Sequence, residues 1–262
     1  MMAAQAVREV AIEPSAPAVI EVAGLNVRFG DLVAIEGMSL SIREGEFVSL
    51  LGPSGCGKST LLKVISGLIP AARGTVEIRP PSLRLGFMFQ KPLLLPWRTT
   101  LSNVLLPIEL QRGGNVVSAA DRRRAIELLE LVRLGEFADA YPHQLSGGMQ
   151  QRAALARTLM SDPDLLLLDE PFGSLDELTR ERLNEELIGI WHSGATRLRT
   201  VIMVTHSVAE AVTMSDRIFV LALRPARVID VVENTLLYPR RLSNAALVNL
   251  IGRTRELLLG AL

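Results

Sequence analysis

The stretch Gly52–Thr60, with the sequence GPSGCGKST, constrains the fold more than any other part of the chain. It matches the pattern G-x-x-x-x-G-K-[ST] in full, and such a loop requires a strand before it and a helix after it. The run Glu46–Leu51 has the character of a strand, and Leu61–Gly67 has that of a helix. This order of elements predicts an α/β fold that binds a nucleoside triphosphate.

The chemistry of this loop depends on its glycines, which let consecutive backbone N–H groups point at phosphate oxygens. The helix that follows presents its positive N-terminus to the same anion. Lys58 can reach the outer phosphates, and the Ser59 hydroxyl can ligate Mg²⁺. A glycine-rich turn without a ligand is the alternative. The residues predicted to contact the nucleotide are Gly52, Pro53, Ser54, Gly55, Cys56, Gly57, Lys58, Ser59 and Thr60.

Apolar strands alternate with helices along the rest of the chain. Leu165–Leu168 and Val201–Thr205 are continuous apolar runs, which is typical of buried parallel strands, and helices are expected after each. Between the early strands and these runs lies a helical block near residues 95–160, in which Asp121 is expected to cap the helix that starts at Arg122. The pattern predicts a parallel sheet covered on both faces, with an inserted helical lobe.

A pair of acidic residues, Asp169-Glu170, ends the apolar run Leu165–Leu168. A carboxylate in the position of Asp169 can lie beside a bound metal, and Glu170 can act as general base toward an attacking water. The pair could instead be an acidic cap at the end of a strand. Its position downstream of a phosphate loop favours the catalytic interpretation.

The octapeptide LSGGMQQR, Leu145–Arg152, lies between these two motifs. Alone, Ser146-Gly147-Gly148 could be a turn and a helix cap, although a serine hydroxyl and open N–H groups at a helix start can also bind a γ-phosphate. In this order the three motifs resemble those of ATP-binding cassette (ABC) ATPases, from about Val19 to Ile229. The resemblance implies a P-loop NTPase parallel sheet core with an antiparallel β subdomain and an inserted helical lobe.

Further site residues follow from this resemblance, one position at a time. Phe29 resembles the aromatic residue that stacks on adenine, and Gln90 resembles the Q-loop glutamine that touches Mg²⁺ or the water. Asp176 resembles the D-loop residue at the dimer interface, and His206 resembles the switch histidine that bonds the γ-phosphate. Outside the family context, Phe29 and His206 would be assigned structural roles. The implied catalytic residues are Glu170, His206 and Gln90; the implied metal ligands are Ser59, Gln90 and Asp169; and the signature residues implied to bind ATP are Ser146, Gly147, Gly148 and Gln150.

The family mechanism implies that two ATPase chains, most simply two copies of this one, pair head to tail. Each ATP then lies between the phosphate loop of one chain and Ser146–Gly148 of the other. ATP and Mg²⁺ are the expected cofactors, and the switch between open and closed dimers is a population shift driven by ATP.

The segment QKPLLLPWRTTLSNV, which begins at Gln90, resembles that of importers for nitrate, sulfonates and taurine. Two departures from that branch are Ala226, where glycine is usual, and Ser207, where aspartate is usual. Trp97 suits a groove that receives a helix of a membrane subunit, although packing within the helical lobe would also explain it. Transmembrane permease subunits and an extracytoplasmic solute-binding protein are the implied partners, at the cytoplasmic face of the inner membrane.

Composition restricts the remaining alternatives. Lysine plus arginine equals aspartate plus glutamate, 28 each, so there is no global positive charge for nucleic-acid binding. No apolar run reaches the length of a membrane span, so permease subunits must be separate chains. An ABC protein of DNA repair would need a long coiled coil, and a tandem translation factor a second phosphate loop; neither is in the sequence. An exporter or an importer of different cargo stays open.

The expected organisation has three parts. Residues 1–17 form a disordered tail, residues 18–239 form the ATPase domain with its helical lobe at roughly 92–160, and residues 240–262 form a C-terminal helix. The single cysteine, Cys56, excludes an internal disulfide, and its small size suffices to explain its place in the loop.

Overall fold

The computed structural model describes residues 17–113 and 117–260, so almost all of the expected N-terminal tail lies outside the described residues. The chain divides into two compact units. The first unit contains the chain up to Leu83 and again from Arg199 onward, and the second is the continuous stretch Arg84–Leu198. The second unit is therefore an insertion into the sequence of the first.

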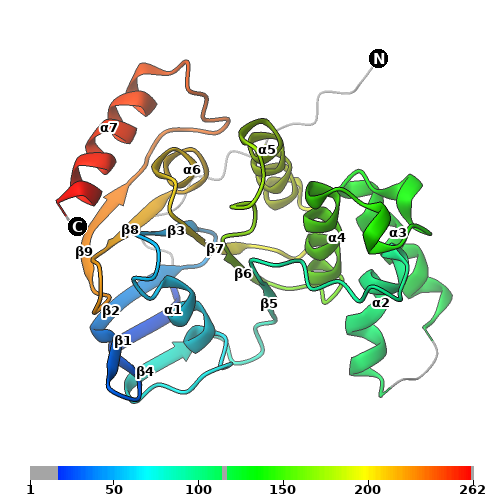
Figure 1. The fold of residues 1–262 in the computed structure, drawn as a ribbon, viewed down its shortest axis with the longest axis horizontal. Helices are drawn as coiled ribbons and strands as arrows, with labels where there is room; N and C mark the ends of the chain where they lie inside the picture. Colours follow the sequence, from blue (N-terminus) through cyan, green and yellow to red (C-terminus); the bar gives the residue numbers. More distant parts are fainter. Residues whose placement is uncertain (1–16, 114–116, 261–262) are drawn as a thin grey trace. The chain divides into compact units, whose positions relative to one another are not determined.

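An antiparallel sheet forms one part of the first unit, with the strand order β2-β1-β4 (Figure 1). Its strands are β1 (Ala18–Phe29), β2 (Leu32–Arg43) and β4 (Arg73–Ile78). Ile20 in β1 pairs with Ile42 on one side and with Ile78 on the other. The antiparallel β subdomain implied by the family resemblance is thus present.

The second sheet of this unit carries the phosphate loop. Strand β3 (Phe47–Leu51) pairs in parallel with β7 (Thr200–Thr205) and with β8 (Arg217–Leu221). Every residue of these three strands is buried, which explains their largely apolar sequences. An antiparallel strand, β9 (Val228–Glu233), extends the sheet beyond β8.

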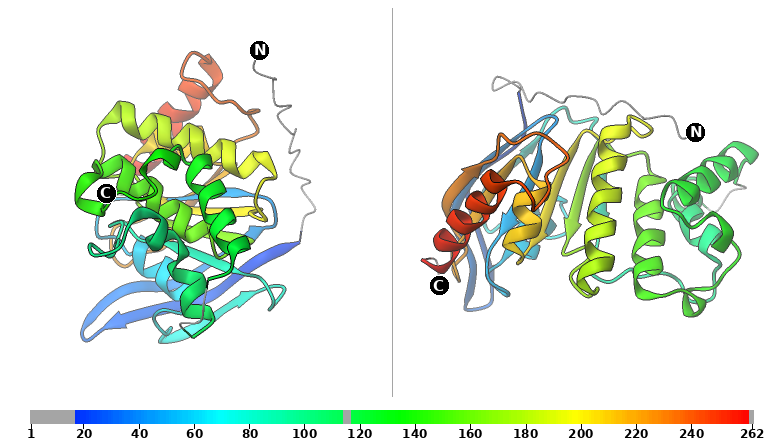
Figure 2. Two further views of the ribbon diagram at one scale, coloured as in Figure 1. Left: turned by 90° about the vertical axis from the view of Figure 1, so that its right-hand side faces the viewer. Right: turned by 90° about the horizontal axis from the view of Figure 1, so that it is seen from above.

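Three helices accompany these strands: α1 (Lys58–Ile65), α6 (Val208–Met214) and α7 (Ala245–Leu259). Helix α7 packs against α6 and β8, and the right-hand view of Figure 2 shows α7 alongside α6. Apolar side chains between α6, α7 and β8 are thereby removed from water, which stabilises the C-terminal part of the fold. The buried members of the shared core are Leu51, Val208, Ala211, Val212, Ile218, Val220, Val232 and Leu247.

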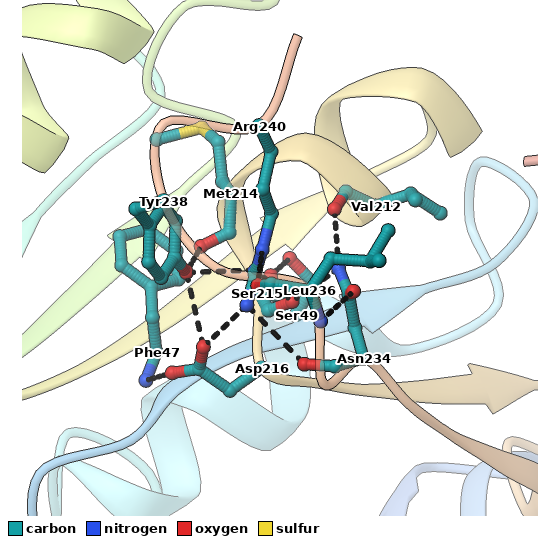
Figure 3. Close-up of polar contacts among 10 residues, drawn as sticks. All are labelled: Phe47, Ser49, Val212, Met214, Ser215, Asp216, Asn234, Leu236, Tyr238 and Arg240. Atoms are coloured by element: carbon teal, nitrogen blue, oxygen red, sulfur yellow. Dashed lines mark hydrogen bonds and ion pairs between the residues drawn. The ribbon is translucent and has the colours of Figure 1, made fainter. Parts of the chain in front are cut away.

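A polar clamp, which we define as Asp216, Asn234, Tyr238 and Arg240, fastens the segment before α7 to the end of α6 (Figure 3). Asn234 Nδ2 donates to the Val212 and Ser215 carbonyls at 2.7 and 3.1 Å. The Tyr238 hydroxyl donates to the carbonyl of Met214, and Arg240 donates to that of Ser215 at 2.6 Å. Carbonyls at and just beyond the end of α6, which lack helical partners, are thereby satisfied by distant side chains.

At the centre of the clamp Arg240 pairs with Asp216 at 2.8 Å, and the two side chains are only 2% and 6% exposed. The guanidinium also lies over the Tyr238 ring, 3.8 Å from its centroid. Burial raises the pKa of Asp216 despite the adjacent cation. Burial also raises the pKa of Tyr238 well above its ordinary value, so the phenol keeps its proton and remains a donor.

The second unit combines a strand pair with helices. Strand β5 (Leu85–Met88) pairs in parallel with β6 (Leu165–Asp169), and helices α2, α3 and α4 lie between them in the sequence. The helices predicted for the lobe occur here as α2 and α3, and α4 begins with the glycine pair of LSGGMQQR. The helices of this unit are α2 (Thr100–Gln111), α3 (Ala119–Leu131), α4 (Gly147–Leu159) and α5 (Glu177–Ser193), with short 3₁₀ turns at Gly135–Phe137 and Pro142–Gln144.

The expected cap of the second lobe helix was wrong. Helix α3 is capped by Ser118, whose hydroxyl accepts from the Asp121 N–H at 3.1 Å, and Asp121 is the third helical residue. The Asp121 carboxylate returns to accept from the Ser118 N–H at 2.9 Å, which completes a capping box. Donation from Ser118 lowers the pKa of Asp121.

Within residues 17–113 and 117–260, no helix combines the length and the apolar character that a bilayer crossing requires.

Candidate functional site

The phosphate loop connects β3 to α1 in the first unit. Gly55 and Gly57 have φ angles of 76° and 117°, which only glycine adopts easily. Gly57 is the N-cap residue of α1 and has no side chain with which to cap the first N–H groups of the helix. These N–H groups and the positive end of the helix fit a phosphate group.

Lys58 lies inside this loop and is 4% exposed. Its ammonium group donates to the Gly52 and Pro53 carbonyls at 2.7 and 2.8 Å, so a cation is already fixed among the loop carbonyls. Cys56, within the loop, is completely buried, which agrees with the interpretation that a small side chain suits this position. The residues present therefore fit a bound triphosphate, whose charge Lys58 would neutralise.

His206 follows β7 in the same unit and is exposed. Thr205 and Glu210 are hydrogen-bonded to each other through their side chains, and the Ser207 N–H donates to Thr205 Oγ1 at 3.0 Å. The Ser207 hydroxyl caps α6 by accepting from the Glu210 N–H at 3.3 Å. Serine therefore performs the capping that an aspartate can perform, and the turn that carries His206 is fixed on both sides.

Phe29, the predicted adenine partner, is the last residue of β1 and is 51% exposed. A half-exposed aromatic ring can receive a stacked base, because about half of its apolar surface is not buried against the rest of the protein.

In the second unit, Asp169 ends β6 and is buried, and Glu170 follows with a φ angle of 45°. A left-handed backbone is unusual for a residue other than glycine, and such strained positions cluster at functional sites. Gln90 Nε2 donates to Glu170 Oε2 at 3.2 Å, so the two predicted catalytic side chains of this unit are in contact.

The signature motif forms the start of α4. Ser146 is the N-cap residue and accepts from the Met149 N–H at 3.3 Å, and Gly147 and Gly148 are the first two helical residues. A Cβ atom on Gly148 would lie 3.0 Å from Cγ2 of Thr179 in α5, so the absence of a side chain permits this close approach of the two helices. Gln150 folds back, and its Nε2 donates to the Pro142 and Leu145 carbonyls at 3.0 and 3.2 Å.

Two residues that we did not select from the sequence connect α4 to the segment after Gln90. Gln151 Nε2 donates to the Gln90 carbonyl at 3.0 Å. The Arg157 guanidinium donates to the Leu93 carbonyl at 2.7 Å and to the Pro92 carbonyl at 2.5 Å. Gln151 lies within the signature octapeptide, so it could have been selected from the sequence. No local pattern distinguishes Arg157.

Asp176 caps α5 by accepting from the Thr179 N–H at 3.0 Å, and donation from the side chain and backbone of Thr179 lowers its pKa. Trp97 and Leu93 are 73% and 55% exposed. Packing within the helical lobe therefore does not explain Trp97, and an apolar surface remains available on this unit.

Among the described residues there is no group of three or more His, Cys, Asp or Glu side chains that could hold a metal ion. Mg²⁺, however, is usually held by one or two carboxylates together with waters and phosphate oxygens. A set made of the Ser59 hydroxyl, the Gln90 amide and the Asp169 carboxylate has the oxygen donors that this ion prefers.

Comparison with known proteins identifies the family. The family model described as "ABC transporter" matches residues 35–173. A solved dimer of an ATP-binding cassette in a post-hydrolysis state, bound to ADP and Pi, superposes with a TM-score of 0.70 at 33% identity, covering 85% of this chain and 100% of that one. The predicted fold class is confirmed.

Curated relatives are similar over most of their length. An uncharacterized ABC transporter ATP-binding protein of Methanocaldococcus jannaschii is 45% identical over 79% of this chain and 77% of its own. The aliphatic sulfonates import ATP-binding protein SsuB of Bacillus cereus is 42% identical over 80% and 82%, respectively. The taurine import ATP-binding protein TauB of Rhizobium johnstonii is 44% identical over 77% of each chain. The predicted resemblance to the sulfonate and taurine branch is confirmed.

Proposed function

The chain belongs to the ABC transporter family, and on that premise we propose that it is the ATP-hydrolysing subunit of a membrane importer for a small solute. Sulfonates and taurine are the first candidates, followed by nitrate or a similar small solute. The observation that carries this proposal is the 42–44% identity to sulfonate and taurine import subunits over more than three quarters of the chain. An exporter or an importer with different cargo is the alternative.

The proposed roles follow the chemistry of each side chain. The loop Gly52–Thr60 binds the phosphates of ATP through backbone N–H groups, and Lys58 neutralises the outer phosphates. Phe29 stacks on adenine. Glu170 is the general base that activates water, Gln90 orients its carboxylate, and His206 bonds the γ-phosphate.

Mg²⁺, when bound, neutralises developing charge on the phosphates. Ser59, Asp169 and Gln90 are the residues that would hold it. Their donor set, a hydroxyl, a carboxylate and an amide oxygen, supports this assignment, since Mg²⁺ favours oxygen ligands.

The chain is proposed to act as a homodimer, in which Ser146–Gly148 of one copy covers the ATP bound to the other. The dimeric cassette that resembles this chain supports this arrangement. Transmembrane permease subunits dock at Trp97 and Leu93, whose exposed apolar side chains provide the surface. The complex works at the cytoplasmic face of the inner membrane with an extracytoplasmic solute-binding protein.

Uptake in reconstituted vesicles tests this function. The chain, its permease and the binding protein are reconstituted, and ATP-dependent accumulation of labelled taurine, methanesulfonate and nitrate is measured. We expect accumulation of at least one sulfonate with the wild-type chain and none with Lys58→Ala, since the variant lacks the phosphate-binding cation. ATP hydrolysis without uptake of any of the three would favour the alternative cargo, and no hydrolysis at all would contradict the ATPase assignment.

A further inference from the structure

The chain between β8 and β9 contacts three glycines of the phosphate loop in succession. We call Leu221–Ala226 the bracing loop. A Cβ atom on Gly52 would lie 3.0 Å from the Leu221 carbonyl oxygen, and one on Gly57 would lie 3.1 Å from the Ala226 Cβ. Arg224 Nε donates to the Gly55 carbonyl. One short segment therefore supports the phosphate loop at its start, middle and end.

The bracing loop is itself anchored to β2. The Ala226 N–H donates to the Ala34 carbonyl at 3.0 Å, and the Ala226 carbonyl accepts from the Glu36 N–H at 3.3 Å. Ala226 is completely buried between these partners and Gly57. On the other side of Arg224, the Ala222 N–H donates to the Arg227 carbonyl at 3.0 Å. The backbone that carries Arg224 is therefore hydrogen-bonded two residues before it and two residues after it.

The Gly55–Cys56 peptide is the part of the phosphate loop that needs such support. With φ of 76° and no Cβ atom at Gly55, this peptide can rotate at little steric cost. Its N–H donates to the Pro53 carbonyl at 3.3 Å, a long hydrogen bond, and its carbonyl accepts from Arg224. The charge-assisted bond from Arg224 is the stronger of the two.

We propose that Arg224 is a positioning residue for nucleotide binding, which holds the Gly55 carbonyl and so keeps the phosphate loop in its binding conformation. The proposal rests on the proposed binding of ATP, but adds a residue that lies 169 positions from Gly55. Because the loop is already ordered when the nucleotide arrives, less conformational entropy is lost on binding. Loss of the bond therefore weakens nucleotide affinity.

Two substitutions separate the hydrogen bond from the charge. Arg224→Gln removes the charge but places an amide nitrogen, Nε2, four bonds from Cα, as Nε is in arginine. Arg224→Met also removes the charge but places a methyl group there. Arg227→Met is the matched control, since Arg227 is an exposed arginine just beyond the bracing loop.

The measurement is the equilibrium Kd of each variant for ADP, which is not hydrolysed, together with the thermal midpoint. We expect Arg224→Met to raise Kd about fivefold, and Arg224→Gln and Arg227→Met to stay within about twofold of the wild type. All thermal midpoints should agree, because Arg224 is exposed.

Three results would overturn the proposal. Equal weakening by Gln and Met at residue 224 would show that charge, not the hydrogen bond, matters. An unchanged Kd for Arg224→Met would show that the phosphate loop needs no support from it. A wild-type chain that does not bind ADP would remove the proposed function itself, which distinguishes that failure from the first two.

Discussion

Gln90 and Glu170 are 80 residues apart in the sequence, and Gln90 Nε2 donates to Glu170 Oε2 at 3.2 Å. The backbone carbonyl of Gln90 in turn accepts from Gln151 Nε2 at 3.0 Å, on the helix that begins with the signature glycines. A continuous series of hydrogen bonds therefore joins the signature helix to the predicted general base. A displacement of α4 would alter the environment of Glu170 without touching it directly.

Replacement of Glu170 by glutamine should separate ATP binding from hydrolysis. The amide oxygen can still accept from Gln90, so the local fold is kept, but an amide cannot take a proton from water. We expect hydrolysis to fall about 100-fold or more, with ATP affinity retained and a nucleotide-bound dimer accumulating. Phosphate release and size-exclusion chromatography with ATP measure these effects.

Glu185→Gln is the control for that experiment, since Glu185 is an exposed carboxylate on α5 of the same unit. It should hydrolyse ATP at the wild-type rate. Normal turnover by the Glu170 variant would show that another group activates the water.

Trp97→Ala should uncouple transport while sparing the isolated subunit. The side chain is 73% exposed, so its loss should change the free energy of unfolding by no more than about 0.5 kcal/mol and leave basal ATPase activity unchanged. Uptake in the reconstituted complex should fall. Leu110→Ala, which removes another side chain that is 71% exposed, provides the comparison, and normal uptake by an assembled Trp97 variant would exclude docking at this residue.

Arg240→Met should destabilise the first unit, because it leaves the Asp216 carboxylate buried without its cation. The expected loss is about 3–5 kcal/mol, measured by urea denaturation, and the double variant with Asp216→Asn should recover part of it. Equal losses in the single and double variants would show that the clamp is not held by this ion pair.

The same substitution predicts a pH dependence. Burial already raises the pKa of Asp216 above its ordinary value, and removal of Arg240, whose charge lowers it, should raise it further. A raised carboxyl pKa contributes stability at low pH that is lost as pH rises through the folded-state pKa. The deficit of the Arg240 variant should therefore be largest at neutral pH and shrink toward pH 4, whereas a deficit independent of pH would point to lost packing alone.

Ser118→Ala should cost about 1 kcal/mol of stability in the second unit, since the hydroxyl caps α3. Ser118→Thr keeps a hydroxyl and should be close to the wild type. Denaturation monitored by circular dichroism compares the two, and identical midpoints for both variants would exclude a role for the capping box.

The parts of the fold that could be predicted from the sequence are those with one dominant physical signal. The run Leu165–Leu168 is continuously apolar because it is buried on both faces, and it is found as β6. Strand β9 (Val228–Glu233) was not predicted, since most of its residues are partly exposed and its sequence is mixed.

The cap of α3 shows a second limit. An acidic residue before a basic run suggested Asp121 as the N-cap, but two alanines with high helix propensity extend the helix back to Ser118. Contacts between residues far apart in the sequence could not be predicted either. Neither the bond from Gln90 to Glu170 nor that from Arg224 to Gly55 has a local signature, because both depend on how distant segments pack.

The complete burial of Cys56 gives the chain a built-in reporter. It is the single cysteine of the sequence, so a thiol reagent can modify the protein at one place only. Because the sulfur is buried within the phosphate loop, its rate of modification measures how often that loop opens. A slower modification rate in the presence of nucleotide would then show that nucleotide orders the loop. No cysteine has to be introduced for this measurement.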